Sequence, residues 1–188
     1  MSQDRIRTFL NSSADLKRTI ADTMAKDIDQ AVQIVRKSLK GGGKLLLMGN
    51  GGSAGDAQHI AAELVGRYKK ERQSVPALAL TVDTSALTAI GNDYGFEEIF
   101  SRQIEGLGQK GDAILAISTS GQSENVVCGV QQAKGMGIHT IGLLGKDGGK
   151  LKDIVDLALV VPSSETARIQ EAHITIGHII CEILDDEF

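Results

Sequence analysis

Five near-continuous apolar runs divide the chain, and segments with helical spacing follow them. A continuous apolar run is typical of a strand that is buried on both faces of a parallel sheet. The predicted strands are residues 44–49, 76–81, 112–117, 138–144 and 155–161. The predicted helices are residues 53–70, 84–90, 95–107, 122–136 and 164–186. This alternation predicts an α/β fold with a three-layer, doubly wound sheet of about five parallel strands.

A long amphipathic segment precedes the first strand. From Ile6 to Leu39 the apolar residues lie three and four apart, and Gly41-Gly42-Gly43 ends the segment. Because globular helices typically run about 8–20 residues, we expect two helices here, or one long helix with a break. The sheet does not need this segment to close. Its apolar stripe therefore predicts packing against another subunit, although packing on the chain's own core explains the pattern equally well.

The length favours one domain. The chain has 188 residues, of which 41% are hydrophobic and 23% charged, and no linker or low-complexity tract interrupts it. We expect a single domain over 1–188, with a helical segment at 1–40 and an α/β core at 41–188.

Charge and cysteine content exclude several classes. A net charge of −4 and 3% aromatic residues argue against nucleic-acid binding. No stretch approaches the roughly 20 apolar residues of a membrane helix, so no membrane association is expected. Cys128 and Cys181 lack CxxC spacing and the N-terminus lacks a secretory signal. A cytoplasmic location is the expectation.

Two predicted strands end in loops rich in glycine and hydroxyl residues. The first loop is Asn50-Gly51-Gly52-Ser53-Ala54, and the second runs from Ser118 to Ser123 as STSGQS. A helix N-terminus offers free N–H groups and the positive end of the helix dipole, so each loop could bind an anion. Neither holds the lysine of a nucleotide-binding loop, which favours the single phosphate of a small molecule. Helix capping is the alternative role of these hydroxyls.

The candidate acid–base residues lie on two predicted helices. His59 and Glu63 are four apart and share one helix face, where such a pair is more often a surface contact. In the last helix Gln170 has two possible partners, His173 and His178, and spacing alone does not choose between them. A histidine in this apolar helix is more often part of the core. His139, Cys128 and Cys181 are interpreted as structural, Asn92-Asp93 as a turn, and Lys146–Lys150 as a solvated turn.

Taken together, these motifs resemble the phosphoheptose isomerases (sedoheptulose 7-phosphate isomerases) of the sugar-isomerase (SIS) domain group. The serine loop alone indicates only the wider group, whose fold is flavodoxin-like, but the combination is far more specific. The match runs in order from about residue 40 to the C-terminus. Its segments are NGGSA (50–54), DAQH (56–59), AEL (62–64), GRY (66–68), GND (91–93), STSG (118–121), GKDGG (145–149) and RIQE (168–171).

The resemblance implies an intramolecular oxidoreductase: an aldose–ketose isomerase that converts sedoheptulose 7-phosphate to D-glycero-D-manno-heptose 7-phosphate through an enediol. This is the first step of ADP-heptose synthesis for lipopolysaccharide heptose. It also implies a homotetramer whose active sites lie at subunit interfaces, built partly by the N-terminal helices.

The resemblance also assigns the site residues. Glu63 and His178 would be the catalytic acid–base pair. The phosphate would be held by Ser53, Ser118, Thr119, Ser120 and Ser123. The sugar would be lined by Asn50, Gly51, Gly52, Glu63, Asn92, Asp93 and Gln170. Zinc, present in some members, would be held by His59, Glu63, Gln170 and His178. A zinc-bound Glu63 is not a free base, so the metal polarises the substrate oxygens, the carboxylate moves off it, or the metal is structural.

Two rival functions share the serine loop. One is a non-catalytic SIS scaffold that binds the replication initiator DnaA; that subgroup lacks the equivalents of Glu63, His178 and Ser120, which this chain has. The other is a regulator, or an isomerase for another sugar phosphate, in which the QHIAAEL and RIQEAH segments are not expected.

Overall fold

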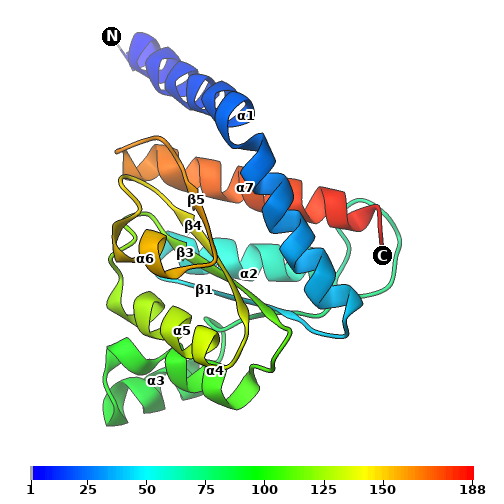
Figure 1. The fold of residues 1–188 in the computed structure, drawn as a ribbon. Helices are drawn as coiled ribbons and strands as arrows, with labels where there is room; N and C mark the ends of the chain where they lie inside the picture. The colour runs from blue at the N-terminus through cyan, green and yellow to red at the C-terminus, as the bar shows by residue number, and fades with distance from the viewer. Residues whose placement is uncertain (1) are drawn as a thin grey trace.

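Five parallel strands form the centre of the structure, a computed structural model that describes residues 2–188 (Figure 1). Along the sheet the strands follow the order β2-β1-β3-β4-β5. They are β1 (Leu45–Gly49), β2 (Ala77–Ala79), β3 (Ala113–Ser118), β4 (His139–Leu144) and β5 (Leu157–Val160). This is the flavodoxin-like strand order, so the predicted fold class is confirmed.

Helices cover both faces of the sheet, as Figure 1 shows. They are α1 (Ser2–Lys40), α2 (Gly52–Val65), α3 (Thr84–Asp93), the 3₁₀ turn η1 (Phe96–Glu98), α4 (Ser101–Leu107), α5 (Glu124–Gly135), α6 (Gly149–Ile154) and α7 (Thr166–Asp185). Because strand side chains alternate between faces, the core divides into two layers. Leu45 and Leu47 of β1 pack with α1, α2 and α7, whereas Leu46 and Met48 pack with α3 to α6.

The register of β1 and β3 defines a crevice. Leu45 lies opposite Ala113 and Gly49 opposite Ile117, so the two strands end side by side. After β1 the chain moves to β2 on one side of β1, and β3 returns on the other. Ligands of doubly wound folds bind at such a switch point, outside the carboxyl ends of the strands.

The N-terminal segment is one uninterrupted helix, so the expected break is wrong. Residues 2–40 contain neither proline nor glycine, the two residues that are least favourable inside a helix. Buried side chains begin at Ile20, whereas Ile6, Phe9 and Leu10 are 55%, 51% and 65% exposed. The N-terminal part of α1 stands away from the sheet (Figure 1).

Five local predictions need correction. The helix predicted at 95–107 is divided into η1 and α4. Helix α2 ends at Val65, not at residue 70, and β2 spans three residues rather than six. Asn92 and Asp93 belong to the last turn of α3. The solvated turn predicted at Lys146–Lys150 leads directly into α6, which begins at Gly149 and buries Leu151. Among residues 2–188, no helix is both long and apolar enough to span a bilayer.

Candidate active site

The two predicted loops lie beside each other at the switch point. Asn50 follows β1 and exchanges two amide hydrogen bonds with Asn125, in the first turn of α5, at 2.8 and 2.9 Å. Asn125 is 3% exposed, so this reciprocal pair is shielded from water. It fixes the spacing of the loops. In the sequence Asn125 is only a polar residue before two valines, so no pattern marks it.

Serine hydroxyls line the second loop. Ser118, the last residue of β3, is buried, and its Oγ lies 3.2 Å from that of Ser123. Ser118 Oγ also accepts from the Gly121 amide, and Ser120 Oγ accepts from the Gln122 amide. Ser123 occupies the N-cap position of α5, yet its side chain makes no capping hydrogen bond there. Thr119, between Ser118 and Ser120 in the sequence, is half-buried. The Val126 and Val127 amides donate to the Ser123 carbonyl, and no side chain within residues 2–188 caps the amides before them, so the N-terminus of α5 can bind an anion.

The first loop begins α2 without a side-chain cap. Gly51 is the N-cap with φ of 54°, a left-handed value that favours glycine. Ser53 is buried in the first turn. A Cβ on Gly52 would lie 2.5 Å from Nε2 of Gln170, so only glycine lets the Gln170 amide approach the start of α2 this closely.

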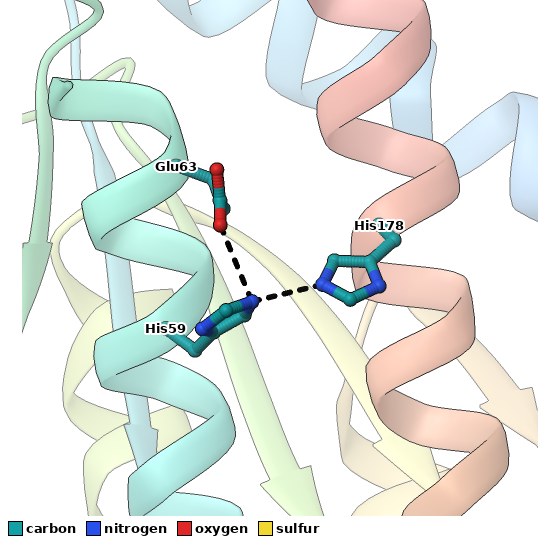
Figure 2. Close-up of side chains that lie close together, drawn as sticks. All are labelled: His59, Glu63 and His178. Carbon is teal, nitrogen blue, oxygen red and sulfur yellow. Dashed lines mark hydrogen bonds and ion pairs between the residues drawn. The ribbon is translucent and has the colours of Figure 1, made fainter. Parts of the chain in front are cut away.

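Three side chains from α2 and α7 converge (Figure 2). Nε2 of His59 lies 2.9 Å from Nε2 of His178 and 3.3 Å from Oε1 of Glu63. The three donor atoms lie within 4.8 Å of one another. The rings of Tyr68 and His178 are 5.8 Å apart. A carboxylate and an imidazole from remote parts of the chain therefore meet within one chain.

The structure distinguishes the two histidines that spacing left open. His173 is fully buried, and its Nε2 lies 2.9 Å from the carbonyl oxygen of Leu144. Burial lowers the pKa of His173 to about 4, so the ring is neutral and donates to that carbonyl. His178 instead faces His59. His173 is a core residue, and His178 belongs to the site.

Asp56, Asn92, Asp93 and Gln170 complete the inventory. Burial raises the pKa of Asp56, one turn before His59, although the His59 charge opposes the shift. Asn92 and Asp93 are exposed at the end of α3, where the Asn92 amide donates to the Asp93 carboxylate.

Gln170 lies against Gly52 at the start of α2. Gly52 is seven residues before His59, a distance of about 10 Å along the helix. Of the four predicted metal ligands, the structure brings His59, Glu63 and His178 together.

The donor set of the cluster fits zinc. Two imidazole nitrogens and one carboxylate oxygen are typical ligands of a zinc site with an open position. Tetrahedral bonds of about 2.0 Å place neighbouring donors roughly 3.3 Å apart, close to the 2.9 and 3.3 Å that separate Nε2 of His59 from the donor atoms of His178 and Glu63.

The chain is similar to several known proteins. The family model of the SIS domain matches residues 8–145. The phosphoheptose isomerase of Aliarcobacter butzleri is 53% identical over 97% of this chain and 96% of its own length, and that of a Nitratiruptor species is 67% identical over 81% of each. The structure of the Francisella tularensis phosphoheptose isomerase superposes with a TM-score of 0.96 at 39% identity, over the full length of both chains.

The fold and the serine loop at its switch point define a protein of the SIS domain class, as the family match shows. Within that class, the chain belongs to the phosphoheptose isomerase family of sugar-phosphate isomerases. The relatives thus favour the enzyme over the non-catalytic scaffold.

Proposed function

We propose that this chain interconverts sedoheptulose 7-phosphate and D-glycero-D-manno-heptose 7-phosphate, the first step of ADP-heptose and lipopolysaccharide heptose synthesis. The observation that carries the proposal is the meeting of Glu63 and His178 within 4.8 Å, in a chain of this family. Aldose–ketose isomerisation needs a base beside the acidic C–H and a proton donor for the oxygens.

The two residues divide the proton transfers. Glu63 removes a proton from C1 of the opened ketose, which gives a cis-enediol, and returns a proton to C2. His178 donates a proton to the oxygen on C2 and accepts one from the oxygen on C1. The sugar is thereby oxidised at C1 and reduced at C2, with no external electron acceptor.

The serine loop anchors the phosphate far from the reacting carbons. Ser118, Thr119, Ser120 and Ser123, with Ser53 from the first loop, offer hydroxyl donors at the starts of α5 and α2. Glu63 lies ten residues beyond Ser53, about 15 Å along α2. An extended seven-carbon sugar phosphate matches this separation better than a short one does. Asn50, Gly51, Gly52, Asn92, Asp93 and Gln170 are proposed to line the sugar.

We further propose that His59, Glu63 and His178 can hold a zinc ion, since their donor set fits that metal, and that Glu63 and His178 transfer protons only when their side chains are off it. When bound, zinc would polarise the carbonyl and hydroxyl oxygens of the sugar as a Lewis acid. Gln170 packs against Gly52, about 10 Å along α2 from His59, so we propose that it joins the metal from a second copy.

A homotetramer is the proposed assembly. The exposed apolar side chains of Ile6, Phe9 and Leu10 leave one stripe of α1 without cover. Further along α1, an apolar groove of about 360 Å³ lies between α1 and α7, lined by residues such as Ile28 and Ile179. Both features suit packing against further copies. The cytoplasm is the proposed location, because both cysteines are free.

The test is an isomerase assay on pentose, hexose and heptose phosphates with the unmodified chain and with Glu63→Gln and His178→Gln. We expect sedoheptulose 7-phosphate to be the preferred ketose. Each substitution should lower kcat by roughly 10²–10⁴-fold, because glutamine neither accepts nor donates the proton. His139→Gln, which changes an exposed histidine at the start of β4, is the matched control and should keep normal turnover.

Two outcomes would contradict the proposal. Near-normal turnover in Glu63→Gln or His178→Gln would remove that residue from the chemistry, and preference for a shorter sugar would refute the substrate. The zinc site is measured separately by elemental analysis. Zinc should bind stoichiometrically to the unmodified chain and be lost in His59→Gln.

A further inference from the structure

A buried ion pair joins the segment after α2 to the end of α7. Nε of Arg72 lies 2.6 Å from Oδ1 of Asp185, and their side chains are only 4% and 2% exposed. The two residues are 113 positions apart in sequence. None of the proposed catalytic steps uses either of them.

Arg72 completes the end of the helix that carries Glu63. The last carbonyls of a helix have no partner within it. The guanidinium group of Arg72 donates to two of them: Nη2 to the Glu63 carbonyl at 2.8 Å and Nη1 to that of Leu64 at 2.9 Å. One side chain thus holds the terminal turn of α2 through the backbone of Glu63 itself.

Asp185 fixes the same segment to α7. Its Oδ2 accepts the backbone amides of Lys69 at 3.0 Å and Lys70 at 2.7 Å, while Oδ1 accepts from Arg72. Tyr68 directly precedes Lys69, and the centroid of its ring lies 5.8 Å from that of His178. Asp185 lies seven residues beyond His178 on α7, about 10 Å along the helix.

We propose that Arg72 and Asp185 are positioning residues that hold Glu63 of α2 at its working distance from His178 of α7. Neither touches the substrate. The inference rests on the proposed function, because it deepens the account of the same acid–base pair. It predicts an effect on the reacting end of the site and not on the phosphate end, which lies at the opposite end of α2.

If Arg72 and Asp185 affected only stability, a variant that stays folded would keep its kcat. A buried ion pair adds little net stability, and its replacement by apolar residues of similar volume is often neutral or stabilising. Apolar side chains, however, cannot hold the Glu63 and Leu64 carbonyls or the Lys69 and Lys70 amides. The double variant Arg72→Met/Asp185→Leu should therefore stay folded and lose the alignment.

The experiment measures kcat, KM and thermal unfolding for this double variant. Because a misplacement of about 1 Å can cost on the order of 100-fold in rate, we expect kcat to fall roughly 10–100-fold. KM for the sugar phosphate should change less than about threefold, since the serine loop is untouched. Amide hydrogen exchange should quicken over residues 60–66 in the same variant.

Two further variants separate the causes. Glu182→Gln removes the exposed ion pair from Lys69, which links the same segment to α7, and should keep normal kcat. Arg72→Lys keeps the charge without the planar fork, so it should lose kcat as well. Normal kcat in the folded double variant, or an equal loss in Glu182→Gln, would overturn the positioning role. Absence of turnover in the unmodified chain would instead refute the proposed function.

Discussion

His173 and His178 stand five residues apart on one helix and have opposite environments. His173 is enclosed by the core, and its Nε2–H donates to the Leu144 carbonyl. Its Nδ1 has no hydrogen-bond partner among the described residues. His178 is half-buried beside His59 and Tyr68. Their roles follow from which face of α7 each occupies. Helical spacing placed them on different faces but did not show which face meets α2.

The buried histidine makes stability depend on pH. The pKa of His173 is lowered to about 4 by burial, against about 6.5 in the unfolded chain. The unfolded state therefore binds more protons between these values, and stability falls as the pH drops from about 6.5 towards 4. The slope contributed by this residue approaches 1.4 kcal/mol per pH unit, as an order of magnitude.

Denaturant unfolding at several pH values, with His173→Gln beside the unmodified chain, measures this contribution. Glutamine keeps a donor for the Leu144 carbonyl but does not titrate. The variant should be less sensitive to pH across that window. Two parallel curves would show that His173 does not cause the pH dependence.

The turn before α6 packs closely against the loop from Ser118 to Ser123. Gly121 has φ of 65°, and a Cβ there would stand 1.9 Å from the carbonyl oxygen of Gly148. The amide of Leu151 also donates to the Gly121 carbonyl. Thus α6 and the turn before it brace the proposed phosphate loop.

Substitution of Gly121 tests this bracing. Gly121→Ala should destabilise the fold by about 1–3 kcal/mol, through strain in the left-handed region, and displace the serines so that KM for the phosphorylated sugar rises. Gly106→Ala is the matched control, because Gly106 lies in α4 with nothing within 4 Å of an added Cβ. The control should be neutral or slightly stabilising. An unchanged KM in Gly121→Ala would separate this loop from the phosphate.

Local patterns predicted three strands to within one residue and most helix ends to within three residues, with the end of α2 and the start of α4 as the exceptions. A buried parallel strand is apolar on both faces, so β1, β3 and β4 lie within one residue of their predicted limits. Helix α2 ends at its C-cap Gly66, a local stop signal that the prediction to residue 70 passed over. The contact between Arg72 and Asp185, which are remote in sequence from each other, has no local signal. Helix α6 follows positive φ angles at Lys146 and Gly148, in a segment whose charges and glycines are typical of a turn.

The candidate site was predictable in its parts. Both glycine loops and the His59–Glu63 pair stand out in the sequence because their residues are neighbours in it. The partner of Glu63 comes from a helix more than a hundred residues later, and spacing left two histidines open. Asn125 and Arg72 act only through the folded chain, so no sequence signal marked them.

The proposed assembly connects α1 with activity. The N-terminal part of α1 meets the rest of the chain where Arg168 donates to the Phe9 carbonyl at 2.7 Å, yet Phe9 and Leu10 remain 51% and 65% exposed. Burial of such a side chain contributes about 1.5–3 kcal/mol, so two of them on every copy form a substantial part of an interface. If Gln170 completes the zinc site from a second copy, separated chains also lose that ligand.

Phe9→Ser/Leu10→Ser should therefore dissociate the proposed tetramer. The fold of each chain should keep its thermal transition, because the buried part of α1 begins only at Ile20. Light scattering after size-exclusion chromatography measures the mass, and turnover is followed over a dilution series. The variant should elute as a smaller species. On dilution it should lose activity at a protein concentration at which the unmodified chain is still active. Asn11→Ser, an exposed polar change on the next position, is the control and should stay tetrameric. A variant that stays tetrameric would show that this stripe lies outside the interface, and full activity in a separated chain would show that each copy carries a complete site.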